Sequence, residues 1–425
     1  MIRPEIVSSA PDARQAPFLV AYVVVFIAAF VALAPLLQII LPLHAGVIDA
    51  AGRTRLLSQA MFWGALTAAV ANVAAGALSD RTTSRFGRRR PWIAAGGILV
   101  ALSYVGILRS QTPLEMTLAV VGFQIAFNTM MAPFLALFAE CVSLERRTTM
   151  SAILGVSYPL AVALGSGLMA LGPQSETGRL WLLALVVVGT SLPFALFFRQ
   201  DGARPLPIAA APSRPGGLLA FMAPFRVRNF ALVWSGRFFV ATGYAFVGAY
   251  LLYFIAEVVG QKARTAELSH SILTAVALVG VFVVAVGVAF AGRRIVSRKP
   301  VALAGAVLLC AATSIVGVSL DWPVMVSAFV IYGLGQGFYG AVEMGLMADV
   351  LPAQEDRGKD MGLINLAVAL PQAIAPIVAI LLLDVGGGMR LLFGAAALCF
   401  GAGAASIAGL RYSNQARLRT GPAAD

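Results

Sequence analysis

Long apolar stretches alternate with short polar segments along almost the whole chain. Each stretch is about as long as the 17 to 25 residues that a helix needs to cross the hydrocarbon core of a bilayer. Twelve such stretches are present, at residues 17–43, 58–78, 92–108, 114–141, 151–171, 180–198, 230–257, 269–291, 301–320, 323–350, 361–385 and 391–410. The pattern predicts an all-α membrane protein with twelve transmembrane helices.

One longer polar segment, rich in Pro and Arg, divides the twelve stretches into two sets of six. We therefore expect one domain over residues 1–198, a linker over 199–229 and a second domain over 230–425. The segment FAECVSLERRTTM (Phe138 to Met150) after the fourth stretch resembles MADVLPAQEDRGKDM (Met347 to Met361) after the tenth. Matched segments at equivalent positions predict two pseudo-symmetric six-helix bundles, an architecture known among transporters.

The composition excludes a water-soluble fold. Of the 425 residues, 60% are hydrophobic and 12% are charged, against about 25% charged in soluble domains. The three cysteines show no spacing typical of a disulfide framework or a zinc site, and no nucleotide-binding loop or nucleophile–base pair appears. We therefore expect no metal, no cofactor and no enzymatic activity.

The net charge of +12 comes from basic residues in the segments between apolar stretches. If the N-terminus is cytoplasmic, the inner segments hold 23 Lys and Arg, the outer loops hold 7, and Arg237 lies inside a span. Cytoplasmic loops carry this excess in membrane proteins. We therefore expect the chain to lie in a lipid bilayer and to bind no nucleic acid. Both termini should lie in the cytoplasm, the membrane should be a bacterial inner membrane, and the protein should be a monomer.

The loop after the second stretch reads GALSDRTTSRFGRRRPW, from Gly76 to Trp92. It resembles the signature between the second and third helices of the major facilitator superfamily. Its extended form is similar to the branch of glycoside–cation symporters and sucrose transporters. The segments NTMMAPFLALFAECVSLERR (Asn128 to Arg147) and DVLPAQEDRGKDMGLINLAVALPQAIAP (Asp349 to Pro376) extend the resemblance over most of the chain, which implies the major facilitator fold.

In this superfamily the signature Asp joins a charge network at the cytoplasmic ends of the helices and locks the outward-facing state. The resemblance therefore implies a gate, and an acidic residue beside fixed cations can make bonds present in only one conformation. The alternative is that the arginines only set topology and touch anionic lipid heads. The predicted gate residues are Asp80, Arg81, Arg85, Arg88 and Arg89, together with Glu140 and Asp349 at the matched ends of the fourth and tenth stretches.

Two ionisable residues lie within the apolar stretches themselves. Arg237 and Glu343 are each seven residues from a predicted cytoplasmic helix end, which places both about 10 Å inside the membrane. Charges at such depth are functional candidates, and matched depth predicts an ion pair. The pair either binds substrate and couples a proton, because a carboxylate released from its guanidinium takes up a proton more readily, or it statically ties the two helices together.

The other candidates for substrate contact are amides and tyrosines. Gln124 and Asn128 lie one turn apart on a helix that the resemblance places at the central cavity, and we favour ligand contact for them. Interhelical hydrogen bonds and aromatic packing are the alternatives. The remaining candidates are Tyr158, Tyr244, Asn365 and Gln372. His44 and His270 fall near outer helix ends, where we expect solvated side chains.

The function that these features favour is a secondary active transporter for a small polar solute, a sugar or glycoside. Cation-coupled members of the resembled branch carry aspartates in their first, second and fourth helices, and the first two spans have none in their apolar cores here. We therefore expect H⁺ as the coupling ion. The alternatives are an exporter of a more apolar compound, which scarce buried charge would suit, and a non-transporting assembly factor of the same fold.

Overall fold

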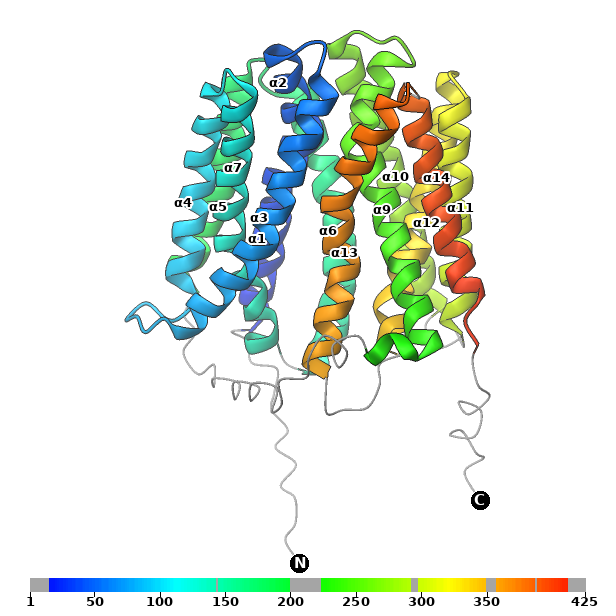
Figure 1. Ribbon diagram of the computed structural model, residues 1–425. Helices are drawn as coiled ribbons and strands as arrows, with labels where there is room; N and C mark the ends of the chain where they lie inside the picture. Colours follow the sequence, from blue (N-terminus) through cyan, green and yellow to red (C-terminus); the bar gives the residue numbers. More distant parts are fainter. Residues whose placement is uncertain are drawn as a thin grey trace, which may run out of the picture. The chain divides into compact units, whose positions relative to one another are not determined.

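A computed structural model describes residues 15–142, 144–198, 223–291, 297–348, 357–386 and 388–411, almost all of which are helical (Figure 1). Twelve segments of this part of the chain are long and apolar enough to cross a membrane, which confirms the predicted number of spans. The helices are α1 (Gln15–Pro35), η1 (Leu36–Ile40), α2 (Leu41–Ile48), α3 (Arg53–Arg81), α4 (Arg90–Arg109), α5 (Pro113–Cys141), α6 (Leu144–Leu171), α7 (Glu176–Phe197), η2 (Ala223–Arg226), α9 (Arg228–Glu257), α10 (Ala263–Ala291), α11 (Arg298–Val318), α12 (Trp322–Ala348), α13 (Arg357–Asp384) and α14 (Gly388–Ala408).

Several helices extend beyond the apolar stretch that defines them, because local sequence signals rather than hydropathy set their ends. The Thr112 hydroxyl caps α5 by accepting from the Glu115 N–H at 3.3 Å, and Pro113 follows directly. The Ser175 hydroxyl caps α7 by accepting from the Gly178 N–H at 3.1 Å. Such side chains satisfy amide groups that the first turn leaves without partners.

The first span is interrupted near its end. Pro35 closes α1, the π-helical turn η1 follows, and α2 carries Pro42 at its start. The Leu41 N–H donates to the Leu36 carbonyl, which is the wider π spacing. A proline ring disrupts the regular bonding of the preceding turn, and a π turn is one way in which a helix continues past such a disruption.

The contacts within the chain group it into two compact units. In the first unit, α4 packs on α5 and α7, α3 packs on α5, and α1 packs on α6 and α7; in the second, α11 packs on α12 and α14. The helices α9, α10 and α13 each contribute to both units, so the grouping follows contacts rather than sequence order, and the predicted domain boundaries stay a prediction. The first unit comprises Met1–Ile208, Gly248–Leu278 and Pro376–Val385, and the second comprises Ala209–Val247, Val279–Ala375 and Gly386–Asp425.

Glycines allow two helix pairs to approach closely, one in each unit. A Cβ built on Gly96 of α4 would lie 2.5 Å from the Met130 backbone nitrogen of α5, and one built on Gly305 of α11 would lie 2.6 Å from the Tyr339 nitrogen of α12. Both members of the second contact lie 209 residues after those of the first (96 to 305, 130 to 339). The same packing contact therefore recurs at equivalent positions of the two halves.

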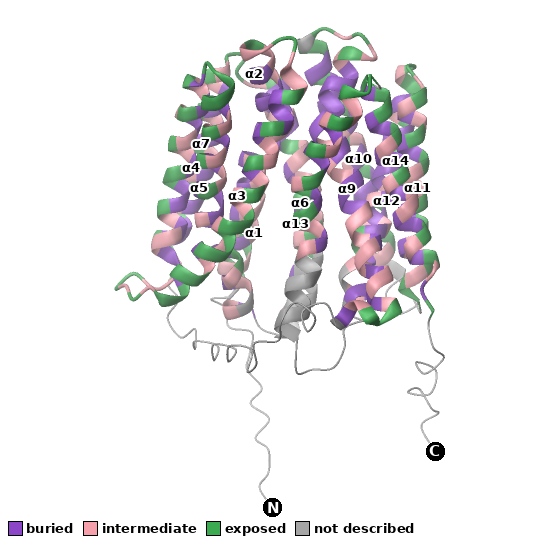
Figure 2. Cartoon of the chain, viewed as in Figure 1, coloured by how far each residue is buried: buried purple, intermediate pink, exposed green. Residues whose placement is uncertain are grey.

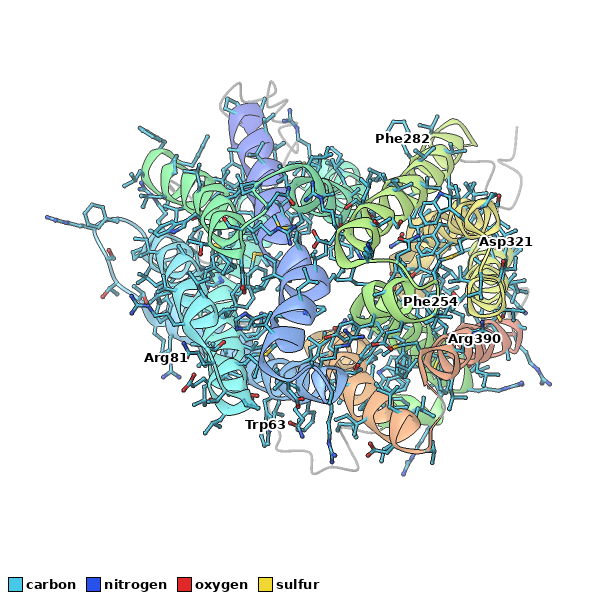
Figure 3. The ribbon with its side chains drawn as sticks, turned by 90° about the horizontal axis from the view of Figure 1, so that it is seen from above. Trp63, Arg81, Phe254, Phe282, Asp321 and Arg390 are labelled. Carbon is cyan, nitrogen blue, oxygen red and sulfur yellow. The ribbon has the colours of Figure 1, made fainter. Side chains whose placement is uncertain are left out.

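The spans differ in how much of their surface is covered. Figure 2 shows buried, intermediate and exposed residues along every helix; α9 is the most buried of the spans and α3 is the least buried. Trp63 of α3 is exposed and points away from the helices (Figure 3), whereas Phe254 of α9 is fully buried. An exposed apolar helix face suits a protein surrounded by lipid.

Candidate functional site

A cluster of charges joins the loop between α3 and α4 to the end of α5. We call the end of the first unit where this cluster lies, with Asp80, Arg88, Arg89 and Glu140, the Arg-rich end. The Arg89 guanidinium contacts Asp80 at 2.5 Å and Glu140 at 2.6 Å, and it donates to the Ser79 hydroxyl at 2.5 Å. Arg88 donates to the same Glu140 oxygen at 2.7 Å. Two of the predicted gate residues, Arg88 and Arg89, thus contact Glu140 at the end of the fourth span, and Asp80 joins them through Arg89.

The geometry of this cluster depends on the loop and on burial. Gly87 adopts φ of 93°, in the left-handed region that glycine enters without strain, just before the two arginines. The side chains of Arg89 and Glu140 are both buried, whereas that of Asp80 is 47% exposed. Burial, together with the charge of Glu140, raises the pKa of the neighbouring Cys141 thiol to about 11.

The other predicted gate residues lie apart from the cluster or outside the described residues. Arg81 is exposed in the last turn of α3, and the Arg85 guanidinium lies 4.7 Å from the centre of the Phe86 ring. Within the described part of the chain, neither joins the ion pairs of Glu140. Asp349 lies outside the described residues.

The second unit contains the charges predicted at membrane depth. Arg237 of α9 and Glu343 of α12 lie 3.2 Å apart, from Nε to Oε1, so the ion pair predicted from matched depth is present. Their side chains are 11% and 24% exposed, and Arg237 also lies 2.7 Å from the Met347 sulfur. Glu343 is close enough to the hydroxyls of Tyr244 and Tyr339 to interact with both electrostatically.

Tyr244 belongs to an aromatic group beside this ion pair. Its ring centre lies 6.1 Å from that of Tyr332 on α12 and 5.4 Å from that of Phe400 on α14. Tyr332 and Tyr339 were not predicted from the sequence. The only available signal was their position on the helix of Glu343, spaced seven residues apart, which places them on one helix face.

In the first unit, the predicted amides bond to a neighbouring helix. The Asn128 amide donates to the Gln124 carbonyl at 2.9 Å and accepts from the Asn72 amide of α3 at 3.1 Å. The Gln124 side chain packs beside Gly64 of α3. The contacts of Asn128 with Asn72 and of Gln124 with Gly64 are interhelical contacts of the kind that the alternative interpretation predicted. Asn72 was missed, although a lone Asn among alanines and valines in a span was a visible signal.

The other predicted contact residues are dispersed. Tyr158 of α6 meets the Phe30 ring of α1 edge to face at 5.1 Å, and its side chain is exposed. Gln372 is exposed on α13. The side chain of Asn365 lies outside the described residues. Ligand contact for these three positions stays a prediction.

The opposite end of the first unit carries a further set of polar contacts. We call it the α2 end, because α2 and the N-termini of α3 and α7 lie there (Figure 1). His44 contacts Glu176 at 2.7 Å and the Ser110 hydroxyl at 2.8 Å. His44 and His270 are both buried, so the prediction that these two histidines are solvated is wrong. Hydropathy places a residue near a helix end but does not show which neighbours cover it.

The N-terminal parts of the chain also bond to α9 and α10 at the α2 end. Arg53 of α3 pairs with Glu257 of α9 at 2.5 Å, and buried Arg179 of α7 pairs with buried Glu267 of α10. Both arginines are among the seven basic residues expected in the outer loops, and their partners were not predicted from the sequence. Partners so distant along the chain leave no local pattern in one sequence.

Twelve membrane spans with a paired Arg and Glu inside them are typical of membrane transporters. A family model described as MFS/sugar transport protein matches residues 47–397. The chain belongs to this family of the major facilitator superfamily. It is a multi-pass integral membrane protein, and its family and fold are those of transporters rather than enzymes.

Solved structures with similar folds come from transporters named for different substrates. A mutant of the nucleoside transporter NupG aligns with a TM-score of 0.68 at 11% identity, covering 92% of this chain and 99% of that one. A bacterial homologue of the human lysosomal transporter Spinster gives 0.63 at 14%, covering 94% and 95%. The human organic anion transporter MFSD10 (TETRAN) gives 0.63 at 17%, covering 94% and 100%. Identities this low show the fold alone, because one fold serves many substrates.

Proposed function

We propose that the chain is a secondary transporter that moves a small polar organic solute, a sugar or glycoside, by alternating access with H⁺ as the coupling ion. The family description names sugar transport. The observation that carries the proposal is the Arg237–Glu343 pair beside Tyr244 and Tyr339. A charge pair and tyrosine hydroxyls inside apolar spans supply donors and acceptors for a hydroxyl-rich solute, and aromatic rings suit its apolar faces.

The proposed coupling uses the same pair. A solute group that hydrogen-bonds to Arg237 competes with Glu343 for the guanidinium, and a carboxylate that loses its cation gains affinity for a proton. One proton would then accompany each solute. The incomplete burial of both side chains leaves them accessible for such an exchange.

We further propose that the Arg-rich end faces the cytoplasm and that its charge cluster acts in gating. The 23 basic residues of the inner segments support this orientation. Glu140 holds both Arg88 and Arg89, so the loop and α5 are tied together through one carboxylate. Both termini would then lie on the cytoplasmic side of a bacterial inner membrane.

Proteoliposomes test the proposed function. The purified chain is reconstituted, and uptake of labelled sugars, glycosides, nucleosides, organic anions and apolar compounds is measured with and without an imposed pH gradient. We expect uptake of a sugar or glycoside that the gradient drives above equilibrium, while liposomes without protein show none. Flux of apolar compounds alone would indicate the exporter, and no flux of any compound would refute transport.

A matched variant separates binding from coupling. Glu343→Gln should retain exchange of labelled for unlabelled solute across the membrane, because the amide still hydrogen-bonds, but it should lose concentrative uptake. Glu115→Gln, the same chemical change at an exposed position of α5, serves as the control and should retain both activities. Concentrative uptake by Glu343→Gln would refute proton coupling through this residue.

A further inference from the structure

Two ion pairs at the α2 end differ strongly in burial. The Arg179 and Glu267 side chains are each 7% exposed, whereas those of Arg53 and Glu257 are 35% and 33% exposed. Both pairs join helices of the first six spans to the α2 end of α9 or α10. The difference in burial predicts different energetic weights for them.

The buried pair is held in place from both sides. The Arg179 Nε donates to the Pro173 carbonyl at 3.2 Å, so the loop before α7 orients the guanidinium. One turn beyond Glu267, the Ser271 hydroxyl donates to the Ser166 carbonyl of α6 at 2.7 Å. These bonds fasten α10 to both α6 and α7 at the α2 end.

Two tyrosines of α9, the helix that carries Glu257 of the exposed pair, form hydrogen bonds with uncharged groups. The Tyr253 hydroxyl donates to the Pro42 carbonyl at 2.7 Å, and Tyr250 shares a hydrogen bond with Ser58 at 2.6 Å. Loss of the Arg53 or Glu257 charge leaves these neutral bonds in place. Water already reaches both charged groups, so a lone charge there retains hydration.

We infer that the Arg179–Glu267 pair is the latch that sets whether the α2 end is closed, and that the Arg53–Glu257 pair contributes little to that equilibrium. The inference rests on the proposed transport function, which requires this end to open. With one partner removed, the remaining charge is buried without compensation in the closed arrangement and hydrated in the open one. Opening then becomes favourable.

The experiment measures the separation of α7 from α10. Spin labels are placed at Thr177 and Thr265, which are exposed and lie two residues from Arg179 and Glu267, in a background where Cys141, Cys310 and Cys399 are replaced by Ala. Pulsed electron resonance in lipid nanodiscs gives the distance distribution. We expect the unmutated pair to give mainly the short distance of the closed arrangement.

Single neutralisation of the latch should shift the ratio of long to short distances by roughly 100-fold or more, since breaking one side of a buried pair is strongly unfavourable. The variants are Arg179→Gln and Glu267→Gln. Exchanging the two residues, as Arg179→Glu with Glu267→Arg, should restore the short distance. The matched controls Arg53→Gln and Glu257→Gln should shift the ratio by about fivefold at most, as expected for exposed pairs.

The outcomes separate this inference from the proposed function. Unchanged distances in both single variants, or equal shifts in the Arg53 and Glu257 controls, would overturn the latch. If a single variant fails to fold, the double Gln variant, which buries no lone charge, should fold and shift the ratio by more than the Arg53→Gln and Glu257→Gln controls, because it lacks the attraction between α7 and α10. Distances need no solute, so absence of flux in the unmutated protein would refute transport and leave the latch result standing.

Discussion

Removing one charge of the Arg237–Glu343 pair should do more harm than removing both. Glu343→Gln leaves the Arg237 guanidinium, which stays protonated in proteins. Arg237→Gln leaves a carboxylate, which can neutralise itself by taking up a proton. The loss of stability should therefore be larger for Glu343→Gln than for Arg237→Gln.

The exposure of the two side chains sets the magnitude. Fully buried pairs lose about 3–5 kcal/mol when one partner is removed, and exposed pairs are worth about 0.2–1 kcal/mol. At 11% and 24% exposure, the pair lies between these limits, so we expect about 2–3 kcal/mol for Glu343→Gln and about 1–2 kcal/mol for Arg237→Gln. The double Gln variant should fall within about 1 kcal/mol of the unmutated protein.

The assay is thermal unfolding in detergent of the four proteins of this double-mutant cycle, with proteoliposome uptake measured on the same preparations. Recovery of stability without concentrative uptake in the double variant would indicate a role in coupling, and recovery of both would indicate a structural tie. Additive losses of stability would refute the reasoning, because residues in contact should show an interaction energy.

Three further predictions concern the first unit. Glu140→Gln should lower the free energy of unfolding by about 2–3 kcal/mol, since buried Arg89 then keeps only half-exposed Asp80 as an acidic partner. Asp80→Asn should lower it by at most about 1 kcal/mol, and equal effects of the two variants in thermal unfolding would contradict this reasoning. The rate of Cys141 alkylation by iodoacetamide should rise about tenfold per pH unit between about pH 8 and pH 10, because only the thiolate reacts and the pKa of this thiol is raised to about 11. A rate that reaches a plateau near pH 9 would show that the pKa is not raised. Gly96→Ala should destabilise the protein by about 1–3 kcal/mol, because the added methyl group would overlap α5. Gly155→Ala, with open space around it, should be neutral or should stabilise the protein by about 0.5–1 kcal/mol. Thermal unfolding of both variants measures the difference.

The fold could be predicted from the sequence because each span carries its own signal. A run of apolar residues long enough to cross the bilayer identifies a helix without knowledge of its neighbours. The pairing of Arg237 with Glu343 was also predictable, since an isolated charge in a span needs a partner and only matching depth was required to find it. Both inferences depend only on how deep a residue lies along the membrane normal, and not on which helices are neighbours.

Contacts that depend on which helix faces which could not be found in this way. Glu267 lies 88 residues from Arg179, and either charge alone fits an ordinary helix end. The burial of His44 was missed for the same reason, because its contacts are with Ser110, just after α4, and with Glu176 of α7. Asn128 showed the converse problem, since an amide suited to a ligand is equally suited to a neighbouring Asn72.

The recurrence of one glycine contact in both halves means that Gly96 and Gly305 are subject to the same steric requirement: at either position a Cβ would overlap the backbone of the facing helix. Tolerance to mutation measured at residues 96 and 130 should accordingly forecast tolerance at residues 305 and 339. Saturation mutagenesis of one helix pair would thus provide a template for interpreting natural variants in the other.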